Sequence, residues 1–147
     1  MHPETLFSAS GKLAMAGWAL LAFAPRWRWS QRIASAIIPL TLAIVYLVLV
    51  VLYFAKSPGG FGTLAQVTEL FHNPWLLLAG WIHYLAFDLF LGSWQAREAQ
   101  RLGISHLLVI PCLLLTFLFG PVGFLVFWAI RSLVKRQLFL EVDREYR

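Results

Sequence analysis

Long uncharged runs, separated by short basic or glycine-rich stretches, divide the sequence into apolar segments. Ile33 to Ala55 runs for 23 residues without a charge, Leu70 to Phe87 for 18 and Leu102 to Ile130 for 29. About 20 apolar residues in a helix cross the roughly 30 Å hydrocarbon core of a bilayer. The pattern therefore predicts an all-α fold, a polytopic membrane helical bundle.

The apolar segments predict about four transmembrane helices in a single integral membrane domain, 1–147. Lys12 interrupts the first segment, and a basic, aromatic stretch typical of a membrane interface follows it from Pro25. Because no small-residue cleavage site follows, we interpret this segment as a retained helix rather than a signal peptide. The predicted helices cover about 6–24, 33–55, 74–92 with an extension to 102, and 105–130, and an amphipathic tail follows at 132–147.

The last apolar segment is too long for one simple span and too short for two. Gly120-Pro121-Val122-Gly123 interrupts it near its middle, and a proline inside a helix removes a backbone hydrogen bond. Two structures fit this pattern. One is a single transmembrane helix kinked at these residues, and the other is a re-entrant pair of half-helices whose break is buried in protein.

Basic residues gather in the first and third loops, at 25–32 and 95–104, whereas the second loop has only Lys56. Cytoplasmic loops carry an excess of Lys and Arg, so both basic loops are expected to be cytoplasmic. Four simple spans would then place Arg131 and Lys135 on the opposite side, together with the N-terminus. The kinked helix remains the first interpretation of the last segment, and this conflict supports the re-entrant pair as its alternative.

Composition agrees with a membrane protein. Of the 147 residues, 60% are hydrophobic and only 13% are charged, against about 25% charged in soluble domains. The net charge of +5 does not indicate nucleic-acid binding, because the basic residues lie at the ends of apolar runs, as bilayer anchors do. Cys112 is the only cysteine, which excludes an internal disulfide. Without a phosphate-binding loop or a nucleophile motif, nucleotide chemistry and serine or thiol catalysis are not predicted.

Three ionisable residues fall inside predicted spans: Lys12, His83 and Asp88. An ionisable group at the bilayer centre costs about 2.5–3.5 kcal/mol on insertion scales, so it usually has a partner or a function. At 100° per residue, His83 and Asp88 lie about 140° apart around the third helix and cannot pair directly. Two interpretations stay open, a proton-transfer site between helices and hydrogen bonding that fixes the bundle. Lys12 lies near the end of its helix, where it can extend to the interface.

The third helix has two stripes of aromatic and polar residues. The aromatic rings of these stripes, beside Asp88 and His83, suit a long apolar or conjugated ligand. Glu98, between Arg97 and Arg101, is expected to belong to a solvated stripe that faces the headgroups. No spacing typical of metal ligands is present, so neither a metal nor a cofactor is expected. One stripe holds Trp81, Tyr84, Asp88 and Gln95, and the other holds His83, Phe87, Phe90, Trp94, Arg97 and Arg101.

Several of these blocks resemble the abscisic-acid-deficient-4-like family, whose bacterial members carry a domain of unknown function. They are residues 78–90 (LAGWIHYLAFDLF), Arg97, residues 110–117 (IPCLLLTF) and residues 119–123 (FGPVG). The resemblance covers nearly the whole chain. The sequence departs from the family pattern at Gly11-Lys12, where Asn followed by an apolar residue is expected, so Lys12 is not expected to be a family catalyst.

The resemblance implies a function, because plant members include neoxanthin synthase, which converts the epoxide carotenoid violaxanthin to the allenic neoxanthin. This isomerisation needs an acid and a base but no net redox step and no redox cofactor. Asp88, His83 and Arg97 fall on the polar motif positions of the family. The resemblance thus implies a catalytic base at Asp88 and a proton donor at His83 or Arg97.

The resemblance also implies partners and a location. We expect an apolar isoprenoid or carotenoid ligand, contact with membrane lipid, and a bacterial inner-membrane protein, since no transit peptide precedes the first helix. A homo-oligomer is compatible with the sequence. The alternative to an isomerase is a non-enzymatic carotenoid-binding or assembly factor, in which the buried polar residues only join helices.

A ligand of this kind needs a cavity, and we expect an elongated apolar one between the third and last helices. Gly lets a ligand or another chain approach closely, and Pro leaves a carbonyl unpaired. The alternative is that Gly120 and Gly123 only let two helices pack tightly. The residues expected to bind the substrate are Trp81, Tyr84, Phe87, Phe90, Trp94, Pro121 and Gly123.

Overall fold

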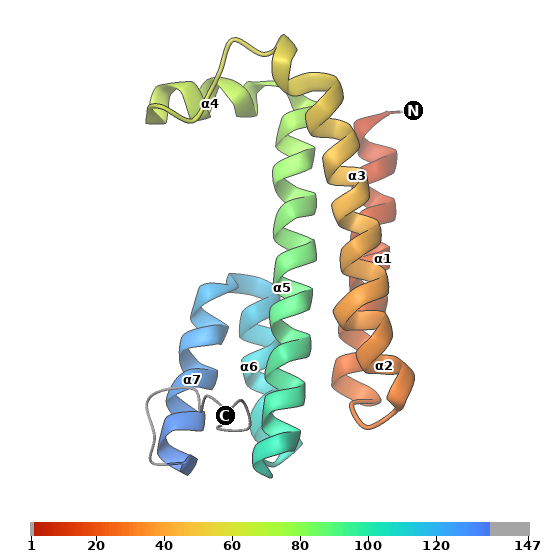
Figure 1. The fold of residues 1–147 in the computed structure, drawn as a ribbon, viewed down its shortest axis with the longest axis vertical. Helices are drawn as coiled ribbons and strands as arrows, with labels where there is room; N and C mark the ends of the chain where they lie inside the picture. The colour runs from red at the N-terminus through yellow and green to blue at the C-terminus, as the bar shows by residue number, and fades with distance from the viewer. Residues whose placement is uncertain (1, 136–147) are drawn as a thin grey trace, which may run out of the picture.

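A computed structural model describes residues 2–135, and these form helices joined by short turns, without a strand among them (Figure 1). The all-α prediction is therefore confirmed for this part of the chain. The elements in order are α1 (Pro3–Phe23), α2 (Arg28–Arg32), the π-helical turn η1 (Ile33–Ile37), α3 (Ile38–Tyr53), the 3-10 turn η2 (Phe54–Lys56), α4 (Leu64–His72), α5 (Pro74–Leu102), α6 (His106–Phe119) and α7 (Pro121–Lys135).

Three helices are long and apolar enough to cross a membrane. They are α1, the continuous helix Arg28–Lys56 that includes α3, and α5. The predicted count of four is not reached in the described residues, because α6 and α7 have 14 and 15 residues. At 1.5 Å per residue each is about 21–22 Å long, which is shorter than the hydrocarbon core.

The last apolar segment forms a helical hairpin. The chain reverses at Gly120, which has a φ of +29° that glycine adopts more readily than other residues. Pro121 then begins α7 at a position where its missing N–H is not needed. Figure 1 shows α6 and α7 side by side along the C-terminal half of α5. The kinked helix is therefore wrong, and the half-helix alternative describes the backbone.

Gly123 sets how closely the two arms of the hairpin approach each other. A Cβ atom at this position would lie 2.6 Å from the carbonyl oxygen of Cys112 on α6 and would also meet the backbone of Thr116. That is closer than a real Cβ approaches backbone, so only glycine fits without a shift. The small-residue packing predicted as an alternative explains Gly123.

The long helix α5 lies at the centre of the bundle and contacts α1, α3, α4, α6 and α7. Asn73 caps its N-terminus by accepting a hydrogen bond from Trp75 N at 3.0 Å, and Gly103, with φ +70°, ends it. Gly92 is buried against the ring of Trp18 on α1, where a Cβ would meet the ring at 2.6 Å. Close helix contact of this kind is typical of membrane bundles.

Residues 57–73, between the second and third predicted helices, contain the helix α4. Thr63 caps it by accepting from Gln66 N at 3.2 Å, and Gly62 N donates to Gln66 Oε1 at 3.1 Å. In Figure 1, α4 lies across the end of α5, nearly perpendicular to the bundle. Its orientation is that of an interfacial helix, with exposed apolar residues such as Leu64.

The basic ends of the helices meet at one end of the bundle. The C-terminal ends of α1, α5 and α7 lie there together in Figure 1. His106 donates to Ala22 O at 2.9 Å and Gln100 to Pro25 O at 2.7 Å, which join α6 and α5 to the end of α1. The hairpin thus removes the charge conflict, because Arg131 returns to the end that holds loops 25–32 and 95–104. Most of the predicted tail, residues 136–147, lies outside the described residues.

Two glycine substitutions test the hairpin. Gly123→Ala is expected to destabilise the protein by about 1–3 kcal/mol, because the added methyl group meets the backbone of α6. Gly11→Ala on α1 is the matched control, since nothing lies within 4 Å of its Cβ position, and should be neutral or stabilise by up to about 1 kcal/mol. Thermal unfolding in detergent measures both, and equal melting temperatures would contradict the tight contact.

Candidate functional site

Four polar residues of α5 form a stripe that faces the hairpin. At 100° per residue, Tyr84, Asp88, Gln95 and Glu98 lie within an arc of about 80°. Tyr84, Gln95 and Glu98 each bond to a residue of α6 or α7, and Asp88 lies against the turn between them. Polar groups in hydrocarbon find no water, so these contacts replace hydration along the inner face of α5.

Asp88 occupies the middle of α5, 14 residues or about 21 Å from Pro74. Its carboxyl group lies against the turn of the hairpin, since a Cβ atom at Gly120 would be 2.8 Å from Oδ1. Oδ2 is buried and has no hydrogen-bond partner among residues 2–135.

Tyr84 lies one helical turn before Asp88, and its hydroxyl group lies beside the carboxyl group. The hydroxyl donates a hydrogen bond to the carbonyl oxygen of Phe117 at 2.7 Å. That carbonyl belongs to the last turn of α6, where helix carbonyls lack intrahelical partners. A carboxyl group and a phenol thus lie close together at the hairpin turn.

Gln95 and Thr116 form a second contact between α5 and α6, and both are fully buried. Gln95 Nε2 donates to Thr116 Oγ1 at 3.0 Å, and the hydroxyl group of Thr116 donates to Cys112 O at 2.8 Å. Both side chains are satisfied within the protein, so this pair has a structural explanation.

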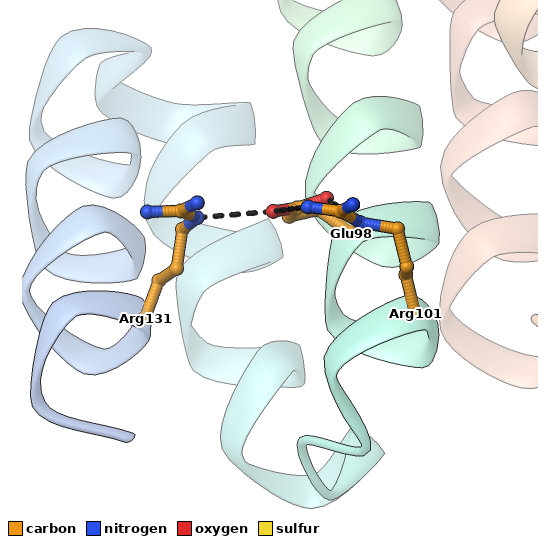
Figure 2. Close-up of polar contacts among 3 residues, drawn as sticks. All are labelled: Glu98, Arg101 and Arg131. Carbon is orange, nitrogen blue, oxygen red and sulfur yellow. Dashed lines mark hydrogen bonds and ion pairs between the residues drawn. The ribbon is translucent and has the colours of Figure 1, made fainter. Parts of the chain in front are cut away.

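Glu98 joins the basic ends of α5 and α7, as Figure 2 shows. Its carboxylate accepts from Arg131 Nε at 3.0 Å and from Arg101 Nε and a terminal nitrogen at 2.9 and 3.1 Å. Glu98 is 7% exposed and Arg131 1% exposed, and the Arg131 guanidinium lies 5.3 Å from the ring of Trp128. The expectation that Glu98 belongs to a solvated stripe is wrong, because the hairpin covers it.

The structure does not bring Asp88, His83 and Arg97 together. His83 lies on another face of α5, stacked on Phe87 at 4.6 Å and 5.5 Å from the ring of Tyr46 on α3. Arg97 is exposed and forms no hydrogen bond or ion pair with any described residue. Their catalytic roles stay predictions, and the ionisable side chain that lies beside Asp88 is that of Tyr84.

The aromatic residues of α5 also divide among its faces. Trp81 lines a groove against α1, with the ring of Phe7 5.5 Å away. Phe87 and Phe90 line a groove against η1 and α3. The predicted cavity between α5 and the last helices, lined by these three residues, is therefore wrong in its placement, since other helices cover those faces.

Three further residues expected to bind the substrate belong to the hairpin or contact it. Trp94 packs against α7, with its ring 5.5 Å from Phe127 and 6.2 Å from Trp128. Pro121 is exposed at the turn, next to Gly120, which lies against Asp88. The space beside Gly123 is filled by α6. Trp94 and Gly123 are thus explained by helix packing.

Sequence reasoning missed the Glu98–Arg131 ion pair and the Gln95–Thr116 contact. Gln95 shares the stripe of Asp88, and Glu98 follows it by three residues, so the pattern of α5 already contained one signal. The second signal was the charge pattern, because four simple spans would have placed Arg131 on the side opposite to the other basic loops. No group of three His, Cys, Asp or Glu residues able to hold a metal ion converges in the described part of the chain.

Comparisons with known proteins agree with the sequence pattern. A family model described as ABA DEFICIENT 4-like matches residues 5–127, a range that contains Tyr84, Asp88, Gln95 and Glu98. A search of curated proteins and a search of solved structures found no match.

Removal of Arg131 tests whether the ion pair holds the hairpin. Arg131→Met should destabilise the protein by about 3 kcal/mol, because it takes one partner from the buried Glu98. The double variant Glu98→Gln/Arg131→Met should lose less than Arg131→Met alone, since no buried charge is then left. Arg97→Gln, at an exposed position, is the control and should melt like the wild type.

Cys112 can report whether the hairpin loosens, and no label site has to be added. It is buried in α6 and is the only cysteine of the chain. Its reaction with a maleimide in detergent should be faster in Arg131→Met than in the wild type or Arg97→Gln. Unchanged melting together with unchanged labelling in Arg131→Met would show that the ion pair does not hold the hairpin.

Proposed function

This chain belongs to the ABA DEFICIENT 4-like family, and from this membership and the polar stripe of α5 we propose that it binds an elongated apolar isoprenoid of the carotenoid class and isomerises it by proton transfer at Asp88. The resemblance to plant members that act on an epoxide carotenoid supports the substrate class. Three helices able to span a membrane support the location, in which the substrate would dissolve.

The observation that carries this proposal is the Asp88 carboxyl group. It lies mid-helix beside the hydroxyl of Tyr84, and its buried Oδ2 has no hydrogen-bond partner among residues 2–135. An epoxide opens to an allenic alcohol when a base removes a carbon-bound proton and the epoxide oxygen gains one. The Asp88 carboxylate would take the proton from carbon, and Tyr84 would give one to the oxygen and regain it from Asp88. Atoms and charge balance, and no redox cofactor is needed.

The second candidate is a non-enzymatic carotenoid-binding or assembly factor. The position of Asp88 against Gly120 favours it, because a carboxylate at the start of α7 stabilises the hairpin through the helix dipole. In this case Asp88 joins helices and the ligand is only held. The two candidates differ in what the loss of the carboxylate changes.

Asp88→Asn keeps the size of the side chain and removes the base. If Asp88 is catalytic, conversion of violaxanthin to neoxanthin by protein in lipid nanodiscs should fall by about 10²–10⁴-fold, while the melting temperature stays near that of the wild type. Glu69→Gln, at an exposed carboxylate on α4, is the matched control and should keep full conversion. Chromatography of the extracted pigments measures both.

The outcomes separate the candidates. A lower melting temperature with unchanged pigment retention would support the assembly factor. Full conversion by Asp88→Asn would contradict the proposed chemistry, and absence of conversion and of bound pigment in the wild type would contradict both candidates.

We also propose that the basic end of the bundle, with loops 25–32 and 95–104, faces the cytoplasm of a bacterial cell. An excess of Lys and Arg on that end supports this orientation. Reporter fusions after Arg28, Arg101 and Lys135 should all report cytoplasm, and a fusion after Gly60 should report the other side. A fusion after Lys135 that reports the other side would contradict the re-entrant hairpin.

A further inference from the structure

A second polar pair lies in a groove beneath α4, on a different face of α5 from Asp88. The groove has a volume of about 400 Å³ between α3, α4 and α5. Its lining is almost entirely apolar and aromatic, and the side chains that carry a polar group are those of Tyr46 and His83. The aromatic walls come from Tyr46, Phe54, Phe61 and Phe71.

The position of α4 across the end of α5 creates this groove. Phe71 of α4 lies over Gly80 of α5, where a Cβ would meet its ring at 2.9 Å. Gly59 lies equally close to α4, with its Cβ position 2.6 Å from Gln66 O, so the preceding loop is tied to the helix. These two glycines thus let the C-terminal part of α4, with Leu70 and Phe71, pack close to α5 and to the preceding loop and line the groove. Figure 1 shows that α4 is nearly perpendicular to α5.

His83 and Tyr46 lack hydrogen-bond partners among the described residues, although their rings lie 5.5 Å apart. His83 follows Pro74 by nine residues, which places it about 14 Å along α5 from the α4 end, within the hydrocarbon layer. Water is not available at this depth to satisfy an imidazole or a phenol. Polar groups there are expected to act on a bound molecule or on each other.

We infer that this groove binds the oxygen-substituted ring of an isoprenoid, with His83 and Tyr46 hydrogen-bonded to the ring oxygen. Flat aromatic walls suit a ring better than a flexible acyl chain, and the volume is within the range of small-molecule sites. The ring oxygen would lie at the depth of His83, and the apolar tail would extend along α5 away from α4. A hydroxylated carotenoid ring and a quinone ring share this chemistry.

This site is independent of the proposed chemistry at Asp88. His83 and Asp88 lie about 140° apart around α5. Residues of α3 and α4 line the groove at His83, whereas the turn between α6 and α7 lies against Asp88. Binding in the groove would therefore persist in Asp88→Asn. If conversion fails and groove binding holds, only the proposed function is lost.

A series of probes tests the ligand chemistry with the protein in lipid nanodiscs. Lycopene has no ring, β-carotene has rings without oxygen, zeaxanthin has hydroxylated rings and ubiquinone-2 has a dioxo ring on a short tail. Quenching of tryptophan fluorescence gives Kd for each. We expect zeaxanthin or ubiquinone-2 to bind about 5–10-fold more tightly than β-carotene, as one or two hydrogen bonds would give. Which of the two binds distinguishes a carotenoid from a quinone.

Two substitutions locate the binding. His83→Phe keeps the stacked ring and removes the nitrogens, and Tyr46→Phe removes the hydroxyl group. Each should weaken binding of the oxygenated probe toward the level of β-carotene and leave the affinity for β-carotene unchanged. His72→Phe, at an exposed histidine on α4 outside the groove, is the matched control. Equal affinity for all four probes, or no effect of either substitution, would overturn the inference and indicate a slot for lipid acyl chains.

Discussion

The absence of water from hydrocarbon is the constraint on which this structure depends. The face of α5 that carries Tyr84, Asp88, Gln95 and Glu98 could not face lipid, because each polar group would lose its hydration there. The hairpin of α6 and α7 covers this face and supplies a carbonyl, a hydroxyl and a guanidinium to it. The hairpin in turn depends on α5, because the buried Arg131 is paired with Glu98, and its guanidinium lies over the ring of Trp128.

Asp88 stands apart within this stripe. Its neighbours on α5 are matched by partners on the hairpin, whereas one of its oxygens is buried without a partner among the described residues. A buried polar atom without a partner costs stability, and structures keep such atoms mainly where they serve a function. The contrast between Asp88 and the satisfied Gln95 is the reason to assign chemistry to the former and packing to the latter.

The sequence predicts the helices well because membrane spans are defined by length and apolar content, which are local properties. It predicts α4 poorly, because a nine-residue helix inside a polar connection has no such signature. The site is predicted in part. Asp88 stands out as a charge in an apolar run, but the separation of His83 from it depends on which helix covers each face of α5. The partner of Glu98 is 33 residues away, and only the reversal at Gly120 brings Arg131 back to it.

The half-length hairpin also gives the molecule different cross-sections in the two leaflets. On the basic side, the described residues place α1, α3, α5, α6 and α7 side by side, whereas on the other side only α1, α3 and α5 cross the hydrocarbon and α4 lies flat at its surface (Figure 1). The protein therefore displaces more acyl-chain volume from one leaflet than from the other. A protein that is wider in one leaflet favours a curved bilayer in which that leaflet lies on the convex side. Curvature of the surrounding bilayer is thus coupled to whether the hairpin is docked on α5.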